Sequence, residues 1–357
     1  MFDPSEPFYL QWHITDRCNL KCRHCYRDAP KPELPAADLD RILAGFLELR
    51  RRMPQEHARV QVAGGEPFLS EQLYRVLEKA SAAGLQTRIL TNGTLIDRAA
   101  AAAVKKAGCR FVQISIEGSR AVHEAIRGPG SFDQALAGAR RLREVGVPVT
   151  FAMTLSKQTA SELPAVLALA KEHADRVGFH RLVPCGKGEG MAAELLSPEE
   201  LCAAFVRILE FKRSEPGIEV PLRDPLWRPF LDKLEFSPVM AGCSAAFGGV
   251  CVESDGTVYA CRRMPMPVGN AARTPLAELW DSAGMRGLRD RAQLKGRCGR
   301  CAMRGQCGGC RAVAWACTGD PMAEDPQCMR RPTVLDRMYL WTLARAFPHR
   351  EEPGGGG

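Results

Sequence analysis

Three cysteines lie close together near the start of the chain, in the stretch CNLKCRHC, as Cys18, Cys22 and Cys25. Their C-x3-C-x2-C spacing puts three thiolates on one short turn. A cubane iron–sulfur cluster has four irons, so three protein ligands leave one iron open to a small molecule. The alternatives are a zinc site, which usually takes a fourth ligand, or three unrelated thiols. The spacing favours a cluster with one open coordination position.

A second group of cysteines follows the spacing C-x7-C-x4-G-x4-C, then C-x2-C-x5-C-x2-C, then one final cysteine. Its members are Cys243, Cys251, Cys261, Cys298, Cys301, Cys307, Cys310 and Cys328. Eight thiolates can saturate two cubane clusters, although paired C-x2-C units also build zinc ribbons. Gly256 in SDGTVYAC suits a hairpin turn that would bring Cys251 and Cys261 together. We therefore favour clusters over zinc.

The elements that must position the first cysteine loop are read from the apolar pattern. We expect strands over residues 8–14, 58–64, 86–92, 110–116, 148–154 and 176–183. Helical spacing lies between them, for example over 39–52 and 131–146, and Gly84, Gly108 and Gly146 follow helices where a left-handed cap is wanted. Strands that alternate with helices imply an α/β fold with a parallel sheet, and its chemistry belongs at the carboxyl ends of the strands.

The pattern changes after the sixth strand. A GKGEG loop, a helix near 197–214 and a proline-rich linker precede the cysteine-rich region. We predict a barrel domain over 1–190, a helix and linker over 191–238, a cysteine-rich domain over 239–331, and a C-terminal helix with a disordered glycine tail over 332–357.

The composition bounds the class of protein. Hydrophobic residues make up 45% of the chain and charged residues 25%, and the net charge is +8. No apolar stretch approaches the ~20 residues of a membrane span, and MFDPSEPFYL has no signal-peptide pattern. We expect a cytoplasmic protein with fifteen cysteines, eleven of which hold metal instead of forming disulfides. The basic residues are scattered without a nucleic-acid motif, so we expect no nucleic-acid and no membrane partner; an acidic ligand stays open.

The cluster loop and the stretch AGGEP (63–67) together resemble the radical S-adenosylmethionine (SAM) enzymes. The resemblance implies a partial (β/α)6 barrel of the TIM type. It also implies that Cys18, Cys22 and Cys25 bind a [4Fe–4S] cluster whose open iron chelates SAM. Reductive cleavage of SAM would then give a 5′-deoxyadenosyl radical that abstracts hydrogen from a substrate.

The same resemblance implies a SAM pocket. His24 and Leu182 would contact the adenine, Ser115 the ribose or methionine end, and Arg127 the carboxylate. The other candidates are Gly64, Gly65, Glu66, Pro67, Asn92, Glu117 and Thr154. The two glycines would let the backbone approach the methionine part of SAM, and Glu66, followed by Pro67, would accept a hydrogen bond from its amino group. Asn92, Glu117 and Thr154 also suit capping or turn roles.

The cysteine-rich region resembles the auxiliary-cluster domain called SPASM. The resemblance implies three [4Fe–4S] clusters in all. Auxiliary cluster I would take Cys243, Cys251, Cys261 and Cys310, and auxiliary cluster II would take Cys298, Cys301, Cys307 and Cys328. The usual C-x3-C spacing is shortened here between Cys307 and Cys310, and Cys317 lies nearby. Cys310 and Cys317 therefore compete for one ligand role, and we favour Cys310. Full ligation predicts electron transfer rather than substrate binding.

Several substrates stay open. The stretch CGGCRAVAWACTGDPMAEDPQC (307–328) is similar to enzymes that remodel tetrapyrrole side chains and to peptide-decarboxylating maturases. Sulfatase-type maturases carry an aspartate where this chain has Arg262, which counts against that class. We expect modification of a ribosomal peptide first, tetrapyrrole side-chain modification second, and a non-catalytic iron–sulfur electron carrier as the alternative without activity.

The expected partners follow from this chemistry. An electron donor such as flavodoxin or ferredoxin would reduce the cluster. The first strand is predicted to begin near residue 8, so we expect no N-terminal leader-binding domain of the kind that many peptide maturases carry. A peptide substrate would therefore need a separate leader-binding protein or the SPASM domain. The catalytic acid or base is not identified; Glu117, His180 and Arg262 are candidates that also have ordinary structural roles available.

Overall fold

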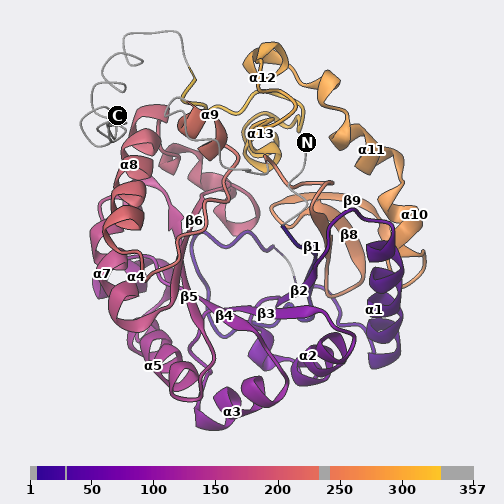
Figure 1. Ribbon diagram of the computed structural model, residues 1–357, viewed down its shortest axis with the longest axis vertical. Helices are drawn as coiled ribbons and strands as arrows, with labels where there is room; N and C mark the ends of the chain where they lie inside the picture. Colours follow the sequence, from indigo (N-terminus) through magenta and orange to yellow (C-terminus); the bar gives the residue numbers. More distant parts are fainter. Residues whose placement is uncertain (1–5, 29, 233–241, 331–357) are drawn as a thin grey trace, which may run out of the picture.

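A computed structural model describes residues 6–28, 30–232 and 242–330 (Figure 1). Six parallel strands curve around a central lumen, and their helices lie on the outside (Figure 1). The strands are β1 (Phe8–His13), β2 (Ala58–Ala63), β3 (Gln86–Thr91), β4 (Phe111–Ser115), β5 (Val149–Leu155) and β6 (Arg176–Arg181). The helices among them are α1 (Ala36–Arg51), α2 (Leu73–Ala82), α3 (Arg98–Lys106), α4 (Arg120–Arg127), α5 (Ser131–Glu144), α6 (Lys157–Ala160) and α7 (Leu163–His173). The predicted α/β fold with a parallel sheet is confirmed.

Local sequence signals agree with the observed ends of the elements. Each predicted strand begins and ends within two residues of the observed one. Gly84, Gly108 and Gly146 have φ values of 75°, 73° and 71°, as expected of left-handed caps. Ser197 and Glu200 form a capping box at the start of α8 (Pro198–Ser214). The helix predicted over 333–346 and the glycine tail lie outside the described residues.

The cysteine-rich region adds its strands to the barrel sheet. Strand β7 (Gly249–Val252) pairs in parallel with β1, and β8 (Thr257–Cys261) and β9 (Met264–Asn270) continue the sheet antiparallel, in the order β6-β5-β4-β3-β2-β1-β7-β8-β9. Gly256, with a φ of 85°, forms the predicted hairpin turn between β7 and β8. The remaining helices are α9 (Trp227–Asp232), α10 (Leu276–Trp280), α11 (Ala283–Arg289), α12 (Gly296–Arg300) and α13 (Arg311–Thr318).

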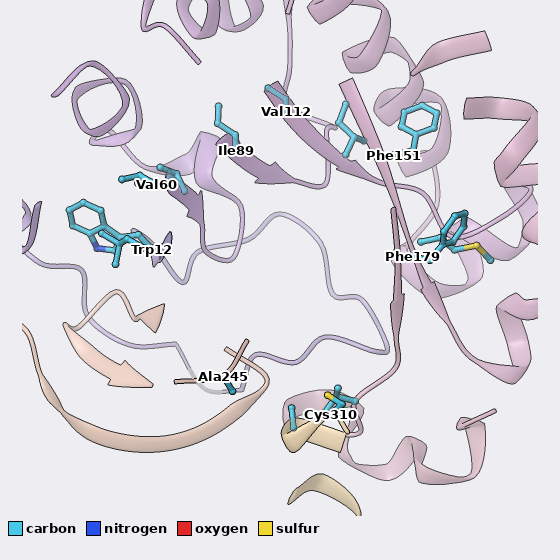
Figure 2. Close-up of a cluster of buried hydrophobic side chains, with 14 of the residues drawn as sticks. Trp12, Val60, Ile89, Val112, Phe151, Phe179, Ala245 and Cys310 are labelled. Atoms are coloured by element: carbon cyan, nitrogen blue, oxygen red, sulfur yellow. The ribbon is translucent and has the colours of Figure 1, made fainter. Parts of the chain in front are cut away.

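The two faces of the barrel strands differ in polarity. Apolar side chains point outward against the helices, and Figure 2 labels six of them on successive strands: Trp12, Val60, Ile89, Val112, Phe151 and Phe179. Phe8 stacks on Phe46 of α1 and meets Trp280 of α10 edge-on. The alternate residues, which point into the lumen, include Gln61 and Arg88, aligned in the β2–β3 register. Within the described ranges, we find no helix long and apolar enough to span a bilayer.

A buried ion-pair network fastens the cysteine-rich region to the end of β6. The Arg181 guanidinium donates to Asp224 at 2.7 Å, to the two Asp325 carboxylate oxygens at 3.1 and 2.9 Å, and to Gln327 at 2.9 Å. Asp325 also accepts from the Cys310 amide at 2.8 Å. Burial alone would raise the pKa of Asp325, but the Arg181 charge lowers it below its usual range. The carboxylate therefore stays ionised at neutral pH.

Replacing Asp325 tests this network. In Asp325→Asn, the buried Arg181 loses one of its two acidic partners and keeps Asp224. Breaking a buried ion pair costs roughly 3–5 kcal/mol of stability. We expect a lower urea midpoint for the unfolding followed by circular dichroism. Asp320→Asn is the matched control, because Asp320 pairs with the exposed Lys295; it should cost less than about 1 kcal/mol. Equal midpoints for the two variants would show that the network does not stabilise the fold.

Candidate functional site

A cavity of about 550 Å³ opens at the carboxyl ends of the barrel strands. Most of the residues predicted to bind SAM and its cluster line it together: Cys18, Cys22, His24, Cys25, Gly64, Gly65, Asn92, Ser115, Arg127, Thr154 and Leu182. Glu66, Pro67 and Glu117 do not line the cavity. The fold thus brings eleven of the fourteen predicted residues to one site, and the remaining three are buried around it.

The cysteine loop runs directly from the end of β1 into the cavity. The Arg127 guanidinium lies 3.8 Å from the Cys22 sulfur, and the Leu20 amide lies 3.4 Å from the Cys18 sulfur. Burial raises the pKa of Cys18 to about 11. A thiol in this setting keeps its proton until a cation replaces it, as it does when metal binds a protein thiolate. Three thiols on one loop at one cavity are a donor set that fits an iron–sulfur cluster.

The two glycines lie directly against the backbone that leads into the cysteine loop. A Cβ on Gly64 would lie 2.3 Å from the Thr15 carbonyl oxygen, and one on Gly65 would lie 2.3 Å from that of Arg17. The Gly65 amide donates to the Thr15 carbonyl at 2.8 Å. The predicted explanation, room for the methionine part of SAM, is therefore incomplete. Both glycines do line the cavity, but their missing side chains make room for the loop backbone.

Glu66 lies beneath the cavity surface. It is fully buried and accepts hydrogen bonds from the Thr91 hydroxyl at 2.6 Å, the Asn92 amide at 2.8 Å and the Phe68 amide at 3.3 Å. Burial raises the pKa of Glu66 to about 7, although these hydrogen bonds oppose the shift. In this structure Glu66 fixes the turn after β3, where Asn92 faces the cavity.

Glu117 organises several cavity residues from behind. Its carboxylate accepts from the Arg127 guanidinium, with Nε at 3.1 Å, and from the Thr154 amide at 2.9 Å, and it lies 3.3 Å from the His24 ring. Burial alone would raise the pKa of Glu117, but the Arg127 and His24 charges hold it well below its usual range. Glu117 is therefore a fixed negative charge beside three candidate SAM contacts, His24, Arg127 and Thr154.

The side of the cavity beside the cysteine loop carries cationic side chains, and we call it the cationic wall. Arg262 and Arg263, in the turn between β8 and β9, line it with Lys187. Burial and the two arginine charges lower the pKa of His180 well below its usual value, so this ring is neutral. Arginine side chains stay charged in proteins, which makes Arg262 an anion contact rather than the acid or base that we considered. Lys187 and Arg263 are not among the predicted residues; the signal for Lys187 is its place in the loop after the last barrel strand.

Several cysteines of the second group lie close enough to affect the pKa of one another, and these effects link them in two sets. Burial raises the pKa of Cys310 to about 12, and the Cys243 thiol acts in the same direction. Burial, followed by Glu253 and the Cys261 thiol, raises the pKa of Cys251.

In the other set, burial raises the pKa of Cys307, with Cys328 and Cys298 among the groups that add to the shift. Cys310 is buried at the start of α13, whereas Cys317, further along this helix, is exposed.

Family models match both halves of the chain. The model described as "Radical SAM superfamily" matches residues 12–170, and the SPASM model, described as "Iron-sulfur cluster-binding domain", matches residues 243–310. The chain resembles the solved structure "Native anSMEcpe with bound AdoMet" with a TM-score of 0.72 at 21% identity, over 95% of this chain and 97% of that one. This likeness supports the fold; AdoMet is another abbreviation for SAM.

Similar proteins of known name fall into two groups. The chain is 31% identical to an "AdoMet-dependent heme synthase" of Methanosarcina barkeri, over 92% of this chain and 98% of that protein. It is 32% identical to a "Pre-heme d1 synthase" of Dinoroseobacter shibae, over 89% and 85% of the two chains. It is 29% identical to "Mycofactocin maturase MftC" of Mycobacterium ulcerans, over 71% and 68%. The loop of three cysteines borders the cavity of about 550 Å³, which we call the SAM-side cavity from here on. This site and the matches agree: the chain belongs to the radical SAM superfamily and is an enzyme with a SPASM domain.

Proposed function

We propose that this enzyme modifies a carboxylate-bearing side chain of a tetrapyrrole. The observation that carries the proposal is that the cationic side chains Lys187, Arg262 and Arg263 line the same cavity as the candidate SAM residues. Carboxylates are the natural partners of such a wall. The named tetrapyrrole synthases also match more of this chain than the peptide maturase does, 89–92% against 71%. The substrate class that we ranked second from the sequence therefore becomes the first.

The roles of the cavity residues follow from their positions. Cys18, Cys22 and Cys25 would hold the [4Fe–4S] cluster, and when bound, the cluster and SAM supply a radical that abstracts hydrogen. Arg127, which Glu117 holds through a hydrogen bond, would bind the SAM carboxylate.

Asn92, Ser115 and Thr154 present polar groups to the same cavity. His180 lines the same cavity and is a candidate proton acceptor, once an anion offsets the arginine charges that lower its pKa.

The eight cysteines of the second group are proposed to hold two further clusters. Auxiliary cluster I would take Cys243, Cys251, Cys261 and Cys310, and auxiliary cluster II would take Cys298, Cys301, Cys307 and Cys328. With four thiolates each, these clusters suit electron transfer better than substrate binding. A small reductant protein such as flavodoxin or ferredoxin would supply electrons in the cytoplasm.

A peptide substrate is the second candidate. The similarity to MftC, which is named a mycofactocin maturase, is the observation that favours it. A peptide would need an acidic side chain or terminus to satisfy the same cationic wall. A separate leader-binding protein would then be a further expected partner.

The first experiment measures SAM cleavage by the anaerobically reconstituted, reduced enzyme. We expect iron coproporphyrin III, a tetrapyrrole with propionate side chains, to stimulate 5′-deoxyadenosine formation and to change in mass. Protein without added substrate and protein with a peptide fraction of cell extract are the comparisons. Stimulation by the peptide fraction alone would replace our proposal with the maturase function. Absence of SAM cleavage under every condition would point to an electron carrier.

A pair of cysteine variants tests the ligand assignment. Cys310→Ala removes a buried thiol beside Cys243, so we expect the reconstituted protein to lose up to one cluster, roughly four irons per chain. Cys317→Ala is the matched control on the same helix and should keep the iron content of the unaltered protein. Iron and sulfide are measured chemically on both proteins. If Cys317→Ala loses iron and Cys310→Ala keeps it, then Cys317 and not Cys310 is the ligand of auxiliary cluster I.

A further inference from the structure

A second cavity, of about 220 Å³, lies in the lumen toward the amino ends of the barrel strands. Six arginines line it, and we call it the arginine chamber: Arg59, Arg88, Arg176, Arg223, Arg262 and Arg263. Leu90, Gln113, His180, Arg262 and Arg263 line this chamber and the SAM-side cavity alike. The two cavities therefore meet in the middle of the barrel.

The acidic residues that line the chamber pair with its partly exposed arginines and not with its buried ones. Among the residues that line it, Glu6 and Glu219 are the acidic ones. Glu6 pairs with Arg223 at 2.6 Å and Glu219 pairs with Arg176 at 2.6 Å, and all four side chains are partly exposed. Arg59 and Arg88 lie deeper, with side chains from β2 and β3 that are 5% and 9% exposed.

The deep arginines have neutral partners and unused donors. Arg88 donates to the amide oxygens of Gln61 and Gln113. Over the described part of the chain, the buried Nε atoms of Arg59 and Arg88 have no hydrogen-bond partner, and neither does the Thr150 hydroxyl. Burying a charge without an opposite charge is costly. These groups are therefore poised to receive an anion.

The electrostatic field inside the chamber is strongly positive. Burial, followed by the charges of Arg59 and Arg223, lowers the pKa of Arg88 well below its usual value. Burial and the Arg223 charge lower the pKa of Arg59 to about 10. A negative ligand would relieve the repulsion among these guanidinium groups. Paired guanidinium N–H donors match the two oxygens of a carboxylate.

The strand register gives the distance between the two ends of the lumen. Arg88 is aligned with Phe111 of β4, and Ser115, which lines the SAM-side cavity, lies four residues further along the same strand. At ~3.3 Å per residue, the two levels differ by roughly 13 Å. A ligand that reaches both levels must be longer than a single amino-acid residue, which a macrocycle with acidic side chains is.

We propose that the arginine chamber binds a carboxylate arm of the substrate while the carbon to be modified stays in the SAM-side cavity. This inference rests on the proposed tetrapyrrole function and adds to it the residues that recognise the substrate. Arg59 and Arg88 are the primary contacts, and Arg262, which lines both cavities, lies between the two ends. The chamber thereby selects substrates by the charge of the side chain opposite to the reacting one.

The test is a fluorescence titration of metal-free coproporphyrin III with the anaerobically reconstituted enzyme. We expect Arg88→Gln and Arg59→Gln to weaken binding roughly 10- to 100-fold, the range for losing a charged hydrogen bond. Arg88→Lys keeps the positive charge but not the paired N–H donors of the guanidinium group, so it should lose less affinity than Arg88→Gln. Arg120→Gln is the matched control, because Arg120 pairs with the exposed Asp133 on the outside of the barrel. Iron content and circular dichroism identify any variant that fails to fold.

Each outcome has a distinct meaning. If folded Arg88→Gln and Arg59→Gln proteins bind the porphyrin as tightly as the unaltered enzyme does, the proposed role of the chamber is wrong. The tetrapyrrole function would still stand. Porphyrin binding that is absent from the unaltered enzyme overturns the tetrapyrrole function itself. A third arm adds citrate, a free polycarboxylate, as a competitor. If citrate raises the melting temperature of the unaltered enzyme without displacing the porphyrin, the chamber binds free anions and the proposal fails.

Discussion

Strand β1 is hydrogen-bonded along both of its edges, to β2 on one side and to β7 on the other, and both halves of the site depend on this pairing. Its carboxyl end continues into the loop of Cys18, Cys22 and Cys25. Its register with β7 places Gln11 opposite Cys251, so a predicted auxiliary ligand is fixed relative to the barrel. The outward side chains of β1, Phe8 among them, are packed against α1 and α10. The core that secures β1 thus also sets the relation between the two groups of cysteines.

The lumen shows what this arrangement costs. Alternation along each strand sends one face to the apolar layer under the helices and the other to the lumen. Glutamines and arginines occupy the inner face, where Gln11 and the Arg88 Nε atom lack hydrogen-bond partners in the described structure. A core of this kind is less favourable than an apolar one. Burying these unpaired polar groups lowers the stability of the fold. A complementary anion that pairs with them would recover part of that free energy as binding energy.

Features encoded by neighbouring residues could be predicted from the sequence. Strand periodicity, the left-handed glycines and the Ser197 capping box depend on residues close in the chain, and all three agree with the structure. The carboxyl-end location of the cysteine loop followed from the order of strands and helices. What could not be predicted depends on distant contacts. Glu66 meets the Asn92 amide, and Arg181 meets Asp325 across 144 residues, and neither pairing leaves a local pattern.

The arginine chamber could be predicted from the sequence only in part. Arg59, Arg88 and Arg176 lie in predicted strands, where they alternate with apolar residues, and this pattern is a visible signal of a polar lumen. Their convergence with Arg262, which lies 86 to 203 residues further along the chain, required the pairing of β7 with β1. The sequence could therefore mark the strands as unusual, but it could not say that the charges share one cavity.

His180 connects the chamber to the chemistry. Its ring lines both cavities and is kept neutral by burial and by the arginine charges around it, Arg262 and Arg263 foremost. A carboxylate bound among those arginines offsets part of their field, and the pKa of His180 then rises. If the chamber binds a substrate carboxylate as proposed, the affinity of the His180 ring for a proton rises only with that carboxylate in place. Recognition in the chamber and protonation of His180 would then be coupled through the charge of one substrate arm.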